Sequence, residues 1–157
     1  MNDTHPAIGH VHLQVSDLER SVKFYSEALG FDLTTRLGDS AAFLSFGGYH
    51  HHLGLNTWHS RGGPPAPRSA AGLYHFAILY PDRASLARAV KRVLASGLTL
   101  DGASDHGVSE AIYLHDPDRN GIELYRDRPR GEWPRDAAGN LAMFTAPLDL
   151  ETLLAEA

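Results

Sequence analysis

The first segment of the chain with a clear hydrophobic pattern lies at residues 8–15. Every second side chain from Val11 to Val15 is apolar, which is the period of a β-strand with one buried face. His10 and His12 fall between the apolar positions. The pattern therefore predicts a strand that turns these two histidines away from its packed face.

A helix is expected directly after this strand. Ser16 and Glu19 are spaced like the two members of a capping box, apolar residues recur at three- and four-residue intervals, and Gly30 is placed to end the helix. Further strands are expected at about residues 32–37, 41–46 and 49–56. The pattern thus predicts a first β-α-β-β-β module over about residues 8–58.

The same order of elements is expected again over about residues 73–127. A strand with an early histidine, His75, precedes a helix that Asp82 is placed to cap. His10 and Asp17 correspond to His75 and Asp82 with one common offset of 65 residues, which indicates an internal repeat. Strands are then expected at about residues 99–100, 111–114 and 121–125.

The repeat predicts an α+β fold in which two tandem β-α-β-β-β modules form a single domain, residues 1–157. One helix covers only one face of each small sheet, so the two open faces are expected to form a half-open, barrel-like sheet around a cleft. Residues 60–72, rich in Gly and Pro, are expected to link the modules. The tail, residues 128–157, is expected to be loop-like with a short C-terminal helix capped by Asp149.

Composition narrows the classes of function. The chain has 14 Lys and Arg against 19 Asp and Glu, a net charge of −5, and no basic stripe, so nucleic acid is not an expected partner. No apolar run approaches the ~20 residues of a membrane span, and the N-terminus lacks the layout of a signal peptide. We therefore expect a cytoplasmic protein. The chain has ten His and no Cys, so any metal must be held by imidazoles and carboxylates.

Three ligand-type side chains are expected to face the cleft. His10 and His75 lie on the first strand of their modules, opposite the apolar positions, and Glu123 has the same orientation on the last strand. Any one of them alone would more often be structural, but they coincide in a duplicated unit. Two imidazoles and one carboxylate on one side of a metal leave the other positions open, as in non-haem iron(II) oxygenases. We therefore predict a divalent metal, Fe²⁺ first, bound by these residues.

Two further groups of residues are candidates for chemistry. In the run at residues 50–52, alternation turns His52 toward the metal, whereas a bulge would turn His51 there. One of the two is expected near the metal as a fourth ligand or an acid/base group, and a solvated turn is the alternative. His106 and Tyr113 are candidates to hydrogen-bond a bound ligand, although either could be structural.

Three motifs carry a resemblance to a known family: HVHLQVSDLERSVKFYSEALGF, LYHFAIL and YLHDPDRNGIELY. Over residues 8–127 they resemble the vicinal oxygen chelate superfamily, which includes glyoxalase I, fosfomycin- and bleomycin-resistance proteins and extradiol catechol dioxygenases. Two more motifs, YHHHLGLNTW and IELYRDRPRGEWPRD, are most similar to the amino-terminal half of catechol 2,3-dioxygenase-type proteins.

The resemblance implies roles for residues that the pattern had already singled out. The family's metal ligands correspond to His10, His75 and Glu123. An acid/base histidine is implied at His51 or His52. The family's histidine and tyrosine before the last ligand correspond to His106, with a shortened spacing, and to Tyr113.

The activity implied by the resemblance is extradiol cleavage of a catechol-like aromatic diol with Fe²⁺. One alternative is a glyoxalase-like isomerase or lyase that uses Ni, Zn or Mn, with His52 as a fourth ligand. The other is a non-catalytic dimer that sequesters an aromatic or drug-like ligand. Typical extradiol enzymes carry four modules and this chain has two, so a homodimer is expected. The site would then lie within one chain or between two.

Overall fold

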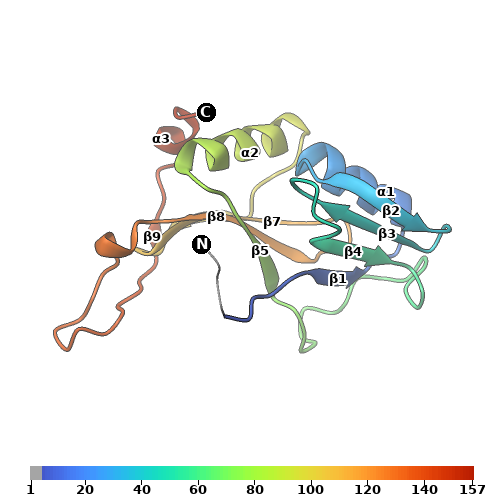
Figure 1. Ribbon diagram of the computed structural model, residues 1–157, viewed down its shortest axis with the longest axis horizontal. Helices are drawn as coiled ribbons and strands as arrows, with labels where there is room; N and C mark the ends of the chain where they lie inside the picture. The colour runs from blue at the N-terminus through green and yellow to red at the C-terminus, as the bar shows by residue number, and fades with distance from the viewer. Residues whose placement is uncertain (1–4) are drawn as a thin grey trace. The chain divides into compact units, whose positions relative to one another are not determined.

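The computed structural model describes residues 5–157 and divides into two compact units, the first ending at Pro65 and the second beginning at Ala66 (Figure 1). The first unit contains a four-stranded sheet in the order β1-β4-β3-β2, in which β1 and β4 are parallel and the other pairs antiparallel. Its strands are β1 (Val11–Gln14), β2 (Asp32–Leu37), β3 (Ala41–Ser45) and β4 (Leu53–Asn56).

The helix of the first unit begins one residue later than the sequence pattern suggested. Asp17, not Ser16, is the N-cap of α1 (Leu18–Lys23), because the Asp17 carboxylate accepts a hydrogen bond from a backbone N–H of the first turn. The helix continues as a π-helical turn, η1 (Phe24–Ala28). Gly30 follows with φ of +80°, a conformation that glycine adopts without steric cost.

The second unit has the same topology with one added strand. Its sheet has the order β5-β8-β7-β6-β9, and β5 pairs with β8 in parallel, as β1 does with β4. The added strand is a two-residue segment of the tail that pairs with β6. The strands are β5 (His75–Leu79), β6 (Gly102–Asp105), β7 (Ser109–His115), β8 (Gly121–Asp127) and β9 (Ala146–Pro147).

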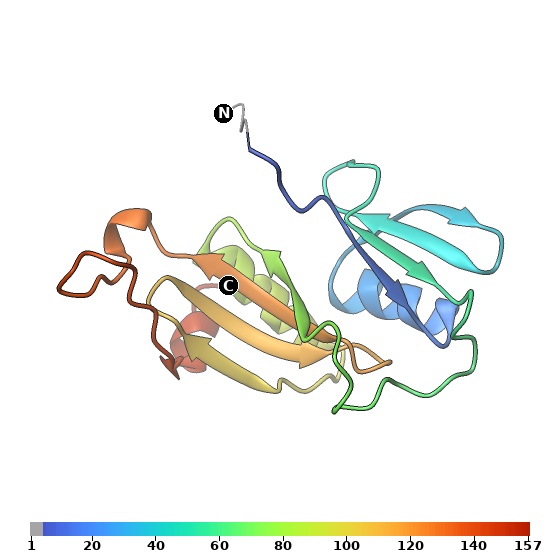
Figure 2. The ribbon, with the colours of Figure 1, turned by 90° about the horizontal axis from the view of Figure 1, so that it is seen from below.

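Two helices lie on the same face of the five-stranded sheet (Figure 2). The longer one, α2 (Arg83–Ala95), is capped by Asp82, and α3 (Leu150–Leu154) is capped by Asp149. A 3-10 turn, η2 (Arg130–Glu132), stands at the start of the tail.

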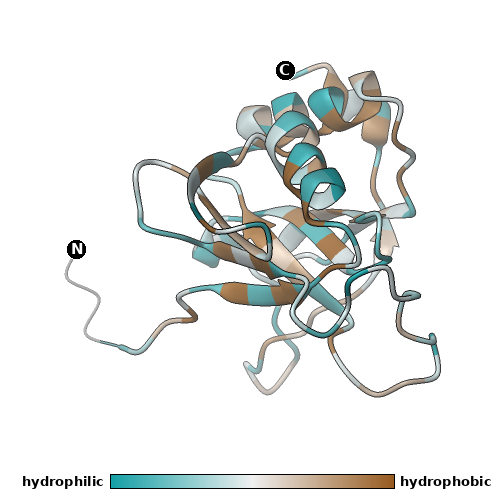
Figure 3. Cartoon of the chain, turned by 90° about the vertical axis from the view of Figure 1, so that its right-hand side faces the viewer, coloured by the Kyte–Doolittle hydropathy of each residue, from teal (hydrophilic) through white to brown (hydrophobic). Residues whose placement is uncertain are grey.

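Each unit buries one face of its sheet under its own helices. Hydrophobic and hydrophilic bands alternate along the strands (Figure 3), as a sheet with one packed face requires. The fully buried side chains of the first unit include Val15, Tyr25, Leu44, Leu53 and Leu55, and those of the second unit include Leu86, Val90, Ile112, Leu114, Ile122, Leu124 and Leu153.

The structure confirms an α+β fold of two β-α-β-β-β modules followed by a short C-terminal helix. Two strands differ from expectation. The strand expected at residues 99–100 is β6, which begins at Gly102 because pairing with β7 starts there. The strand expected from Tyr49 is β4, which begins only at Leu53.

The expectation that residues 1–157 act as one domain around a cleft stays a prediction. None of the helices within residues 5–157 has the length and apolar content that crossing a bilayer requires.

Candidate metal centre

His75 and Glu123 lie side by side on neighbouring strands of the second unit. In the parallel ladder His75 stands opposite Gly121, and Ala77 stands opposite Glu123. The side chains of His75 and Glu123 therefore share one face of the sheet. His75 Nε2 is 2.9 Å from Glu123 Oε2. Only glycine fits at position 121, because a Cβ there would lie 2.2 Å from the carbonyl oxygen of Tyr74. This close approach of β5 and β8 brings the imidazole to the carboxylate.

The spacing of the two side chains fits a divalent metal. Two ligand atoms that each lie about 2.1 Å from a metal, at right angles, are about 3.0 Å apart. Imidazole nitrogen and carboxylate oxygen also suit iron, zinc, manganese and nickel. Among residues 5–157, no three His, Asp or Glu side chains already lie close enough together to form a complete metal site. His10, the third predicted ligand, belongs to the first unit.

Tyr113 and His106 form a second pair beside the first. Tyr113 stands directly opposite Glu123 in the antiparallel β7–β8 ladder, and its ring centroid is 5.9 Å from that of His75. His106, in the turn before β7, places Nε2 2.7 Å from the Tyr113 hydroxyl. Burial, together with the negative charge of Glu123, raises the pKa of Tyr113, so the phenol keeps its proton at neutral pH. The second unit therefore gathers four of the predicted site residues.

A cavity of about 690 Å³ opens beside these strands. It is lined only by residues of the second unit, among them His75, Tyr113, Tyr74, Arg68 and Arg119. A cavity of this volume is typical of sites for small organic ligands. A ligand held there would lie against both His75 and Tyr113.

In the first unit, His51 rather than His52 lies next to His10. The ring centroids of His10 and His51 are 4.5 Å apart, and His51 also packs edge-on against Phe43 at 5.1 Å. The His52 ring instead approaches the Ser45 hydroxyl, with Nδ1 2.9 Å from Oγ. The structure therefore brings His51, and not His52, to the face that carries the predicted ligand.

Two histidines of the first unit, His12 and His51, have lowered pKa values. Burial, and then the positive charge of a protonated His10, lower the pKa of both His12 and His51. Nδ1 of His50 lies 2.7 Å from Nδ1 of His51, so one of these nitrogens carries a proton and the other accepts it.

The strand register shows that His52 is not at the position equivalent to Glu123. His12 of β1 pairs with Gly54 of β4, as Ala77 pairs with Glu123 in the repeat, and the 65-residue offset makes His12 and Ala77 equivalent. The first-unit position that corresponds to Glu123 is therefore Gly54. His52 lies two residues before it, so it does not occupy the place of a fourth ligand equivalent to the glutamate.

The structure adds one group that the sequence did not indicate. The backbone carbonyl of Phe144 lies 3.0 Å from Nδ1 of His106. Because a backbone acceptor has no side-chain signature, no sequence pattern marks it.

The chain is similar to known proteins along most of its length. The model of the Glyoxalase/Bleomycin resistance protein/Dioxygenase superfamily matches residues 7–124. A catechol-2,3-dioxygenase of Bacillus subtilis is 47% identical over 155 residues, which cover 99% of this chain and 53% of that protein. A biphenyl-2,3-diol 1,2-dioxygenase of Rhodococcus globerulus is 30% identical over 126 residues, which cover 78% of this chain and 63% of that protein. The chain thus spans about half to two thirds of the length of these relatives.

Solved structures agree on the fold. A glyoxylase/bleomycin resistance protein/dioxygenase domain from Frankia superposes with a TM-score of 0.65 at 21% identity, covering 80% of this chain and all of that one. At this identity the likeness concerns the fold alone. The family model carries the assignment, because it matches most of the chain. The chain belongs to the glyoxalase/bleomycin resistance protein/dioxygenase superfamily.

Proposed function

We propose that this chain is an Fe²⁺-dependent, extradiol-type dioxygenase that opens the ring of a catechol-like aromatic diol. The observation that carries the proposal is the 2.9 Å spacing of His75 and Glu123 next to the hydrogen-bonded pair of Tyr113 and His106. The Bacillus relative, named a catechol-2,3-dioxygenase, supports the reaction class.

His10 is proposed as the third ligand of the same metal. Its support is the repeat, in which His10 takes the place of His75 on the first strand of its module. The proposal treats residues 1–157 as one functional domain. It is compatible with a metal bound within one chain and with a metal shared between the two chains of a homodimer.

The chemistry divides between the metal and the side chains around it. When bound, Fe²⁺ supplies a Lewis acid with open positions on the side away from its protein ligands. Tyr113 hydrogen-bonds an oxygen of a diol held in the cavity that it lines, and His106 orients the Tyr113 hydroxyl. His51, whose ring lies next to that of His10, is the proposed base that removes one proton from the diol.

The test is oxygen consumption by the chain after anaerobic loading with Fe²⁺. With catechol, we expect uptake of one dioxygen per diol and a coloured ring-opened product. The variant Tyr113→Phe should lower turnover about 100-fold with iron content unchanged, whereas Tyr49→Phe, an exposed tyrosine of the first unit, should behave as the wild type.

Three results would overturn the proposal. An iron-loaded chain that consumes no oxygen with any diol is not a dioxygenase. Isomerisation of a hemithioacetal by the Ni-, Zn- or Mn-loaded chain would establish the glyoxalase-like alternative. Tight binding of an aromatic ligand by every metal form, without turnover, would establish a ligand-sequestering protein.

A further inference from the structure

We propose that the segment after β8, residues 128–157, belongs to the site because it fixes the tautomer of His106. The family model ends at residue 124 and does not cover this segment. The role of His106 in turnover rests on the proposed function. The tautomer itself follows from the structure of the second unit alone.

The hydrogen bonds of His106 assign its proton. Nδ1 lies 3.0 Å from the carbonyl oxygen of Phe144, and a carbonyl oxygen can only accept, so Nδ1 carries the proton. In a neutral imidazole, Nε2 then has a free lone pair. Nε2 lies 2.7 Å from the hydroxyl oxygen of Tyr113, so the Tyr113 hydroxyl donates a hydrogen bond to Nε2 of His106.

This direction of hydrogen bonding decides what Tyr113 can do. Because the Tyr113 hydroxyl donates its hydrogen bond to His106, its oxygen is free to accept a hydrogen bond from a hydroxyl of the diol. When this hydroxyl ionises, as distinct from the one that His51 is proposed to deprotonate, its proton passes to the Tyr113 oxygen and the tyrosine proton passes to Nε2. The product is a diol anion and an imidazolium whose Nδ1–H still donates to Phe144. The opposite tautomer would direct the Nδ1 lone pair at a carbonyl oxygen and would repel it.

Phe144 is 48% exposed, but one edge of its ring packs over Gly107. Gly107 has φ of +74°, and a Cβ there would lie 2.5 Å from Cε1 of Phe144 and 2.8 Å from Cγ of Pro134. Two residues further along, Ala146 of β9 pairs with Asp105 of β6. The tail therefore runs along the edge of the sheet directly beside the residue that it orients.

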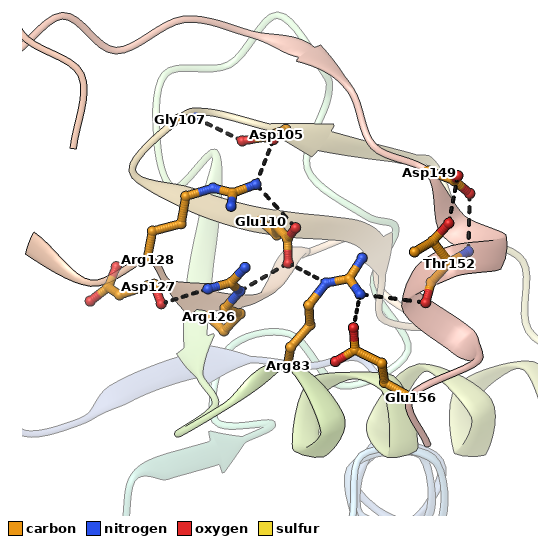
Figure 4. Close-up of polar contacts among 10 residues, drawn as sticks. All are labelled: Arg83, Asp105, Gly107, Glu110, Arg126, Asp127, Arg128, Asp149, Thr152 and Glu156. Carbon is orange, nitrogen blue, oxygen red and sulfur yellow. Dashed lines mark hydrogen bonds and ion pairs between the residues drawn. The ribbon is translucent and has the colours of Figure 1, made fainter. Parts of the chain in front are cut away.

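Ion pairs anchor the start of the tail (Figure 4). Arg128, the first residue after β8, donates to Asp105 at 2.7 Å and to Glu110 at 3.2 Å. Glu110 is only 4% exposed and also accepts from Arg126 at 2.9 Å. Asp105 in turn accepts from the backbone N–H of Gly107 at 2.8 Å. The residues on both sides of His106 are thus fixed to the beginning of the tail.

A second set of polar contacts anchors the end of the tail. Arg83, at the start of α2, donates to Glu110 at 2.9 Å, to the carbonyl oxygen of Thr152 in α3, and to Glu156, which follows α3 (Figure 4). Leu153 of α3 is fully buried. Because both ends are tied to the unit that holds His106, the Phe144 carbonyl is a fixed acceptor.

The test reads the tautomer directly, by NMR of the 157-residue chain with ¹⁵N- and ¹³C-labelled histidine. The sample contains no added metal, at a pH where His106 is neutral, and the His106→Gln variant assigns the signal. We expect the Nδ1–H tautomer as the major form. Phe144→Ala should reduce its population at least twofold, in favour of the Nε2–H tautomer that free imidazole side chains prefer.

Three control variants test whether a group other than the Phe144 carbonyl fixes the tautomer of His106. Met143→Ala truncates a neighbouring exposed side chain, Thr145→Val removes the hydroxyl 3.2 Å from Nδ1, and Tyr113→Phe removes the partner of Nε2. All three should keep the Nδ1–H tautomer. An Nε2–H tautomer in the wild type would overturn the proposal, as would a tautomer that changes in Tyr113→Phe and not in Phe144→Ala.

Turnover tests separately whether the tautomer of His106 contributes to the proposed reaction. In catechol-dependent oxygen uptake, Phe144→Ala should lower kcat about tenfold with KM little changed, because without the ring the backbone carbonyl is no longer held against Nδ1 of His106. Unchanged kcat in Phe144→Ala would show that the tautomer has no role in the reaction. If the wild type consumes no oxygen but shows the Nδ1–H tautomer, the proposed function fails and the tautomer assignment stands.

Discussion

Gly54 in β4 occupies the strand position that Glu123 occupies in β8. Both stand opposite equivalent residues, His12 and Ala77, in sheets of the same strand order. A Cβ on Gly54 would lie 2.9 Å from Cγ of His12, so the imidazole fills the space above the glycine. The first unit therefore has a histidine over a glycine where the second has the carboxylate of Glu123.

This arrangement predicts that Gly54 and His12 are energetically coupled. Gly54→Ala should lower the free energy of unfolding by about 1–2 kcal/mol, since the ring must move aside. In a His12→Ala background the same substitution should change it by less than about 0.5 kcal/mol. Iron content should be unchanged in all three variants. A penalty of equal size in both backgrounds would show that the ring is not what Gly54 accommodates.

The two histidines before β4 are predicted to differ in function. His51→Ala should lower catechol turnover about 100-fold while the chain still binds iron, because His51 lies next to His10 and is the proposed base. His52→Ala should lower only the free energy of unfolding, by about 1 kcal/mol, through its hydrogen bond with Ser45. Oxygen uptake and metal analysis separate the two. Loss of iron in His52→Ala would reverse the assignment.

Glu110 is predicted to dominate the stability of the second unit. Its removal leaves the guanidinium groups of three arginines, partly buried, without their shared carboxylate. Glu110→Ala should therefore lower the free energy of unfolding by about 3–5 kcal/mol. Denaturant unfolding followed through Trp133, in a Trp58→Phe background, reports on this unit. Glu132→Ala, an exposed control, should stay within about 0.5 kcal/mol of the wild type.

The free energy of unfolding of the second unit should fall at low pH because Asp105 becomes protonated. Burial opposes its ionisation, but the hydrogen bond from Gly107 and the ion pair with Arg128 outweigh burial and lower the pKa of the carboxyl. A carboxyl with a lowered pKa stabilises the fold above its unfolded pKa of about 3.9, and this contribution disappears as pH falls through the lower folded pKa.

Asp105→Asn provides the measurement. The wild type should exceed the variant in free energy of unfolding by about 1–2 kcal/mol, constant from pH 7 to pH 5. The difference should shrink below about pH 4. A difference that grows on acidification would contradict the assignment of the ion pair.

Periodicity was sufficient to predict the two modules. The alternation around His10 and His75, and the equivalent Asp17 and Asp82, marked the same strand and helix twice, and both aspartates are the helix caps. Periodicity did not predict where β4 begins, because the run before Leu53 has the composition of a strand and forms a ring-stacked turn.

The residues of the candidate site also divide into those that the sequence predicted and those that it did not. Alternation along single strands placed His75 and Glu123 on the same side, and the parallel ladder shows that they share one face. Tyr113 was predicted only to contact a ligand, and it stands opposite Glu123 in the antiparallel ladder. The alternation of side chains along a strand could not decide between His51 and His52, since both lie outside the regular strand. Nor could it indicate the acceptor at Phe144, which is a backbone atom 38 residues away from His106.

The most direct test of the central claim is the stoichiometry of Fe²⁺ binding under anaerobic conditions. One ion per chain is predicted for the wild type and for His59→Ala, a control that removes an exposed histidine. Ala at His10, His75 or Glu123 should each weaken binding at least about tenfold, with the circular dichroism of the fold retained. A folded His75→Ala chain that binds iron as tightly as the wild type would contradict the proposed metal centre.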